Sequence, residues 1–143
     1  MPDDLGMLLY LPYRELENRV FAALAEAGFD DVTPAQARVF QRIGRNGSRL
    51  TELAEAARIT KQTAGFLVDQ LERAGYVERT PDPTDARARL VRIAERGLRA
   101  IPVGLAAIAE VEREWTAHLG QRRMAALRDA LTRLREITDP NLL

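Results

Sequence analysis

The sequence contains no cysteine and only one histidine, His118, among its 143 residues. Without cysteine the chain has no disulfide, no thiolate nucleophile, no zinc–thiolate site and no thiol through which to sense oxidants. A single histidine also leaves no nucleophile–base pair and no cluster of metal ligands. We therefore predict that the protein is not an enzyme and that it holds neither a metal nor a cofactor.

Long apolar runs are missing as well. The N-terminus, with Asp3 and Asp4, leads into a short apolar run over residues 7–11, which is too brief for a secretory signal or a membrane-spanning helix. With 46% hydrophobic residues, the chain can still bury the core of one compact domain. We expect a cytoplasmic protein with no membrane segment.

An excess of charge of one sign is also absent, because the formal net charge is zero. The charges are nevertheless unevenly distributed. Residues 1–33 carry 2 basic and 7 acidic side chains, residues 34–99 carry 13 basic and 8 acidic ones, and residues 100–143 carry 6 of each. The central part is therefore basic, which suits a nucleic-acid partner. Taken alone, the charge is equally compatible with a solvated surface.

Residues 50–73 have the pattern of a helix-turn-helix. Apolar residues repeat at helical spacing before and after a break at Arg58 and Ile59. Thr60 precedes the second helix at the position of an N-cap. This second helix keeps its apolar residues on one side, and its other side is the surface that a recognition helix turns to the major groove. That side carries Lys61, Gln62, Gly65, Phe66, Asp69 and Arg73.

A hairpin is predicted directly after the helix-turn-helix. Gly75 ends the helix, and two strand-like runs follow at residues 76–80 and 89–93. The residues between them, 81–88, are polar and contain two prolines, which indicates a long loop at the tip. A hairpin in this position is typical of the wing of a winged helix.

Four segments carry a resemblance to a known family: residues 51–54, residues 61–63, residues 71–79, and residues 82–90 with Gly97 beyond them. Together they resemble the MarR family of bacterial transcriptional regulators. The likeness extends over nearly the whole chain, and its most specific part is the Asp-x-Arg sequence of the wing. The resemblance implies a mainly α fold with a small β wing, to which residues 48–50 add a short strand before a helix capped by Thr51.

The resemblance also implies one domain in two parts. Residues 34–97 are the DNA-binding winged helix-turn-helix, and residues 1–33 and 98–143 are dimerisation helices. We expect a helix over residues 5–28, either kinked or interrupted at Pro12, and a helix that starts after Thr33 and runs to about Ile43. The apolar surface of the terminal helices is larger than the winged helix-turn-helix can cover. This favours a homodimer over a monomer whose terminal helices fold back onto the winged helix-turn-helix.

The recognition helix offers several candidate contacts to double-stranded DNA. Gln62 suits an adenine edge, whereas Thr60, Lys61 and the neighbouring Thr63 at the helix start suit phosphate or guanine. Gly65 either lets the backbone approach the groove floor or is a tolerated helix glycine. Phe66 either contacts a thymine methyl group or packs against a neighbour.

The wing supplies the remaining candidate DNA contacts. The resemblance implies that Arg87 enters the minor groove, where a narrow A·T-rich groove attracts a guanidinium. Asp85 either orients that arginine and stiffens the wing or only shapes the turn. Arg79 and Arg89 are candidate phosphate contacts. The chain departs from the family pattern at Ala86, where an arginine is usual.

The terminal helices contain four residues that suit a small-molecule effector of aromatic or phenolic character: Tyr10, Tyr13, Trp115 and His118. Packing or dimer contacts are the alternative for each of them.

Two functions follow from these features. The first is a transcriptional regulator, a repressor, that binds a pseudo-palindromic operator as a homodimer and is released by an effector. The second is a small-molecule-binding or protein-interaction module that has kept the fold and lost operator binding.

Overall fold

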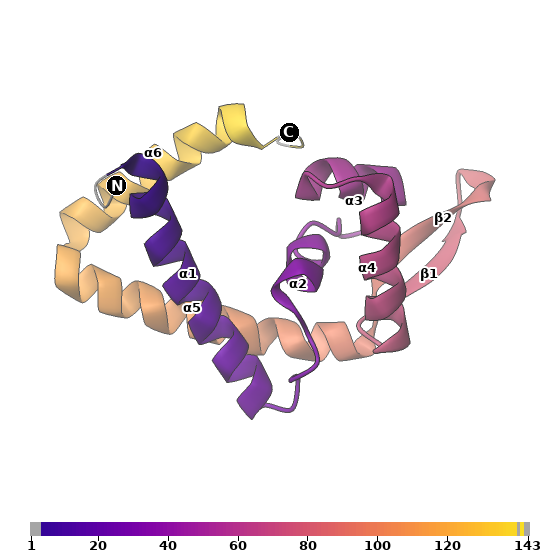
Figure 1. Ribbon diagram of the computed structural model, residues 1–143, viewed down its shortest axis with the longest axis horizontal. Helices are drawn as coiled ribbons and strands as arrows, with labels where there is room; N and C mark the ends of the chain where they lie inside the picture. Colours follow the sequence, from indigo (N-terminus) through magenta and orange to yellow (C-terminus); the bar gives the residue numbers. More distant parts are fainter. Residues whose placement is uncertain (1–3, 140, 142–143) are drawn as a thin grey trace. The chain divides into compact units, whose positions relative to one another are not determined.

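The computed structural model describes residues 4–139 and Asn141, and it consists of helices with one small hairpin (Figure 1). The chain order is α1 (Leu5–Glu26), α2 (Pro34–Phe40), α3 (Leu50–Ala57), α4 (Lys61–Arg73), β1 (Val77–Asp82), β2 (Asp85–Ile93), α5 (Glu95–Leu119) and α6 (Gln121–Thr138). The predicted fold class, mainly α with a β wing, is confirmed. Among the described residues, each helix is too short or too polar to span a lipid bilayer.

The described residues form two compact units. The first contains residues 4–30 and 100–128, and the second contains residues 31–99 and 129–139 with Asn141. The winged helix-turn-helix lies in the second unit, which also takes in the end of α6. Both α5 and α6 therefore pass from one unit to the other.

In the first unit α1 is one uninterrupted helix. The side chain of Asp4 caps it by accepting a hydrogen bond from the backbone N–H of Met7 at 3.0 Å. Pro12 lies inside the helix, so the expectation of a separate segment before it is wrong. Gly28, with φ of +95°, follows the helix end.

In the second unit local capping fixes most helix starts. Thr33 and Gln36 form the predicted capping box, with N···O distances of 3.2 Å and 3.1 Å. The predicted extension of α2 to Ile43 is wrong, because the helix ends at Phe40. The predicted cap at Thr51 is wrong too. Helix α3 begins at Leu50, two residues earlier than a cap at Thr51 would place it, and its N-cap is Arg49, whose backbone N–H donates to the Glu52 carboxylate at 2.8 Å.

The core of the helix-turn-helix consists of apolar residues from α2, α3 and α4. Helices α2, α3 and α4 pack against one another, and β1 packs against α4. The fully buried side chains at this centre are Val39, Leu53, Ala64, Val68 and Leu71. Their burial leaves the opposite side of α4 exposed.

The wing is longer and tighter than predicted. β1 and β2 pair antiparallel from Val77 opposite Ile93 to Pro81 opposite Arg89, and only two residues separate the strands. The predicted eight-residue loop is therefore wrong. Pro81 is accommodated within β1, as proline can be in a strand with an unpaired edge. The predicted third strand is reduced to one residue, Ser48, which forms two hydrogen bonds with Val91 at 3.0 Å and 2.8 Å.

Tyr76 and Gly97 connect the wing to the start of α5. The Tyr76 side chain is buried, its hydroxyl donates to Asp31 at 2.5 Å, and Arg96 lies 4.3 Å over its ring. A Cβ atom at Gly97 would lie 2.4 Å from the carbonyl oxygen of Tyr76. The absence of a side chain at Gly97 thus allows α5 to begin directly against the backbone of the wing.

Candidate nucleic-acid interface

The start of α4 is organised by Thr60. Its side-chain oxygen accepts a hydrogen bond from the Thr63 N–H at 3.1 Å and lies 2.9 Å from the Thr63 hydroxyl. This confirms Thr60 as the N-cap and joins two of the predicted DNA contacts in one capping interaction. The positive end of the helix dipole lies here, next to the exposed Lys61, which suits the binding of a phosphate.

The outward side of α4 presents the predicted contact residues. Lys61, Gln62 and Thr63 are exposed, and the Phe66 side chain is 59% exposed. Little of the Phe66 ring therefore packs within the described chain, and the ring is accessible to a partner.

Gly65 lies half-buried on the same helix. A Cβ atom at this position would first meet Leu50 Cδ2 at 3.5 Å, which is ordinary van der Waals contact. Packing inside the protein therefore does not require glycine here.

The tip of the wing leaves Arg87 accessible. Asp85 accepts a hydrogen bond from the backbone N–H of Arg87 at 3.0 Å, so its carboxylate shapes the turn. The exposed Arg87 guanidinium has no ion pair or hydrogen bond with any described residue. Arg89, also exposed, donates to the carbonyl oxygen of Arg79 at 3.2 Å.

Arg79 differs from the other candidate contacts, because α4 already holds its guanidinium. Nη2 lies 2.8 Å from Asp69, and Nη1 lies 2.8 Å from Glu72. The Arg79 backbone N–H also donates to Glu72 at 3.2 Å, and the side chain is only 21% exposed. Arg79 fastens β1 to the recognition helix and has little freedom to reach a phosphate.

A second charged connection, which no sequence pattern predicts, joins the wing to the helices. Nε and Nη2 of Arg49 lie 2.8 Å and 2.6 Å from one carboxylate oxygen of Asp82, whose side chain is 6% exposed. The other oxygen accepts from the N–H and the hydroxyl of Thr84, each at 2.8 Å. The bonds from Thr84, followed by that from Arg49, lower the pKa of Asp82 below its ordinary value.

The end of α6 also contacts the winged helix-turn-helix through charged side chains. Asp139 pairs with Arg42 at 2.6 Å and with Arg135 at 2.9 Å, and Arg58 donates to the carbonyl oxygen of Thr138. The hydrogen bonds from Arg135 and Arg42 hold the pKa of Asp139 far below its usual range. The residues in these contacts are 97 and 80 positions apart in the sequence, so local sequence patterns could not predict the contacts.

The predicted effector residues lie in the first unit. The Tyr10 and Tyr13 side chains are 51% and 45% exposed, and the Tyr13 hydroxyl donates to the buried Glu17 at 3.1 Å. Trp115 is half-buried and His118 is exposed.

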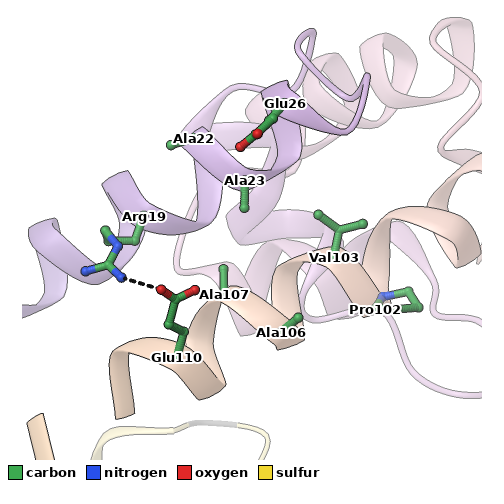
Figure 2. Close-up of a pocket in the computed structure, with 9 residues that line it drawn as sticks. All are labelled: Arg19, Ala22, Ala23, Glu26, Pro102, Val103, Ala106, Ala107 and Glu110. Atoms are coloured by element: carbon green, nitrogen blue, oxygen red, sulfur yellow. Dashed lines mark ion pairs between the residues drawn. The ribbon is translucent and has the colours of Figure 1, made fainter. Parts of the chain in front are cut away.

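A cavity of about 580 Å³ lies between α1 and α5 of this unit, and none of those four residues lines it (Figure 2). Its walls are mostly small apolar side chains, including Ala22, Ala23, Ala106 and Ala107. Arg19 lies at its edge, paired with Glu110 at 3.5 Å and with Glu114 at 2.7 Å.

Comparison with known proteins gives consistent similarities. Residues 30–88 match the model of the MarR family. A curated relative, the exopolysaccharide II synthesis transcriptional activator ExpG of Rhizobium meliloti, is 26% identical over 120 residues. That alignment covers 84% of this chain but 61% of the relative, so the chain spans under two thirds of the relative's length.

Solved structures share the fold. The transcriptional regulator Tm0710 from Thermotoga maritima is 28% identical with a TM-score of 0.63, and the alignment covers 92% of each chain. A probable transcriptional regulator from Pseudomonas aeruginosa is also 28% identical, with a TM-score of 0.62 and coverage of 92% of this chain and 97% of that one. A crystal structure of MarR is 25% identical, with a TM-score of 0.74 and coverage of 92% and 95%.

Proposed function

We propose that the chain is a transcriptional regulator of the MarR family, whose model residues 30–88 match, and that it binds a specific DNA operator. One observation carries the proposal: a single unit presents the exposed Lys61, Gln62 and Phe66 of α4 together with an unpaired Arg87 on the wing. In this function α4 enters the major groove, where Gln62 contacts an adenine edge. Arg87 enters the adjacent minor groove.

The proposed regulator acts as a homodimer on a pseudo-palindromic operator. Support comes from large apolar side chains that stay exposed in the single chain, among them Leu8 and Leu11 of α1 and Leu131 and Leu134 of α6. Apolar stripes of this kind are typical of helices that a second copy covers. Two winged helix-turn-helix units related by a twofold axis would bind DNA half-sites about 34 Å apart.

We propose repression as the mode of regulation, since a dimer on its operator excludes polymerase without making any further contact. The curated relative is named as an activator. A promoter–reporter assay with and without the protein distinguishes the two modes: repression requires reporter output to fall, and a rise would assign activation.

We further propose that a small aromatic or phenolic molecule releases the DNA. The α1–α5 cavity, at about 580 Å³, has the size of a drug-sized ligand site, and it is an alternative to the predicted set of Tyr10, Tyr13, Trp115 and His118. A panel of phenolic acids, tested for release of bound DNA in wild type, Tyr13→Phe and Arg19→Ala, distinguishes the two locations. If no acid releases DNA, this part of the proposal fails.

The alternative function, an interaction module without operator binding, has two observations in its favour. The net charge is zero, and Arg79 is already paired with carboxylates of α4. Both weaken the electrostatic attraction to DNA on which non-specific binding depends.

The deciding experiment measures fluorescence anisotropy with DNA selected from a random library and with unselected DNA, at several salt concentrations. We compare wild type, Arg87→Ala, and Arg45→Ala as a control that removes another exposed arginine from the same unit. Salt-dependent binding that prefers the selected DNA and is weakened more by Arg87→Ala supports the regulator. If selection recovers no preferred sequence, the alternative function gains support.

A further inference from the structure

We propose that Arg49 and Asp82 are positioning residues for DNA binding: their ion pair holds the wing on the helix-turn-helix so that Arg87 meets the DNA together with α4. This inference rests on the proposed function. Neither residue needs to touch DNA in this role. They act through the wing that carries Arg87.

The carboxylate of Asp82 is fully engaged at the outer end of β1. One oxygen receives both Arg49 nitrogens, and the other receives the N–H and the hydroxyl of Thr84, all within 2.8 Å. At 6% exposure, such a carboxylate is well ordered only while these donors remain, because burying it unpaired is costly. The strand pairing also shifts register between Pro81 and Asp82, so that Asp82 pairs with Asp85.

Arg49 belongs to the helix-turn-helix. It is the residue before α3, its N–H donates to Glu52 at 2.8 Å, and its carbonyl oxygen accepts from Leu53 N–H at 3.1 Å. Leu53 is fully buried in the core that α3 shares with α4. The guanidinium therefore extends from a fixed helix start to the far end of the hairpin.

The other connections of the wing lie farther from its tip. Arg79 binds α4 near the middle of β1, and Ser48 pairs with Val91 near the end of β2. A two-stranded ribbon beyond such contacts is marginally stable by itself. Arg87 lies on the outer part, two residues after Asp85 in the turn. Loss of the Arg49–Asp82 pair should therefore widen the range of positions that Arg87 samples relative to α4.

The test is a double-mutant cycle in the full chain. Arg49→Gln removes the charge from a side chain that is 42% exposed, so the variant should fold. We expect roughly a fivefold to tenfold loss of affinity for selected DNA, and little further loss when Arg49→Gln is added to Arg87→Ala. Asp82→Asn should behave in the same way. Arg96→Gln, which removes the partner of Asp31 in the same unit, is the matched control. Any loss of affinity that it causes should add in full to the loss caused by Arg87→Ala.

Hydrogen exchange without DNA provides a second measurement. Amides of residues 84–90 should exchange faster in Arg49→Gln than in wild type or Arg96→Gln, with unchanged exchange in α4. The inference is overturned if Arg49→Gln binds DNA like wild type, or if its loss is the same with and without Arg87. If wild type binds no selected DNA, the proposed function fails and with it the DNA-positioning role, while faster exchange would still identify the pair as the support of the wing.

Discussion

Gly65 and Gly97 are both helical glycines, but a methyl group would meet very different surroundings at the two positions. At Gly97 it would lie 2.4 Å from the carbonyl oxygen of Tyr76 and 2.8 Å from the Phe40 ring. Neither the backbone of Tyr76, which leads into β1, nor the half-buried Phe40 ring can yield cheaply. We predict that Gly97→Ala lowers the free energy of unfolding by more than about 2 kcal/mol, measured by urea denaturation. A loss below about 0.5 kcal/mol, the size of an ordinary surface substitution, would contradict this account.

Gly65→Ala should have the opposite effect on stability. The added methyl group meets Leu50 at 3.5 Å without a clash, and alanine favours the helix by about 0.5–1 kcal/mol over glycine. We predict a higher melting temperature. DNA affinity of the same variant then decides between the two interpretations of Gly65. A loss means that the backbone must approach the groove, whereas unchanged affinity means that the glycine is merely tolerated.

The docking of the C-terminal end of α6 should weaken at acidic pH. Arg135 and Arg42 lower the pKa of Asp139 below its ordinary value of 3.8, so its charged form stabilises the docked helix end. That contribution is complete above the unfolded pKa and is lost as the pH falls below about 4. We predict that Asp139→Asn speeds amide exchange at the end of α6 near neutral pH, and that this difference from wild type shrinks towards pH 3. A difference independent of pH would contradict the ion-pair explanation.

The elements that sequence could predict are those fixed by neighbouring residues. Thr33 and Thr60 cap helices through bonds three residues away, and apolar spacing located the core of α4. The errors arose where a local signal was overridden. Pro81 suggested a loop, yet strand pairing continues through it, and Thr51 suggested a cap where Glu52 instead supports an earlier cap at Arg49.

The candidate site was predictable to the same extent. Exposed residues of α4 follow from helical periodicity, so Gln62 and Phe66 could be assigned to the outward side. Periodicity does not reveal which carboxylates approach an arginine in space. Arg79 therefore looked like a phosphate contact, and the pairing of Arg49 with Asp82, 33 residues away, could not be seen.

Assembly of the protein should depend on the apolar side of α6. Leu131 remains 43% exposed, and no described residue of α6 is buried. We predict that Leu131→Glu weakens the proposed homodimer, because burying a charge without a partner costs at least about 2 kcal/mol, or roughly thirtyfold in the dissociation constant. Sedimentation velocity measures the change.

The control for this experiment is Ala125→Glu, which adds the same charge about 120° around α6 from Leu131, because each residue turns the helix by about 100°. It should leave the dimer unchanged. Equal dissociation by both variants, or by neither, would show that the Leu131 side of α6 is not the interface.

The ion pairs of Arg79 with Asp69 and Glu72 bear on how the proposed regulator would find its target in a genome. An arginine already neutralised within the protein displaces few counterions from random DNA, so non-specific complexes are short-lived at physiological salt. A molecule with no net charge adds little long-range attraction. The protein would then search mainly by brief encounters through solution, with short sliding on any one stretch, and its occupancy of the operator would follow its free concentration closely.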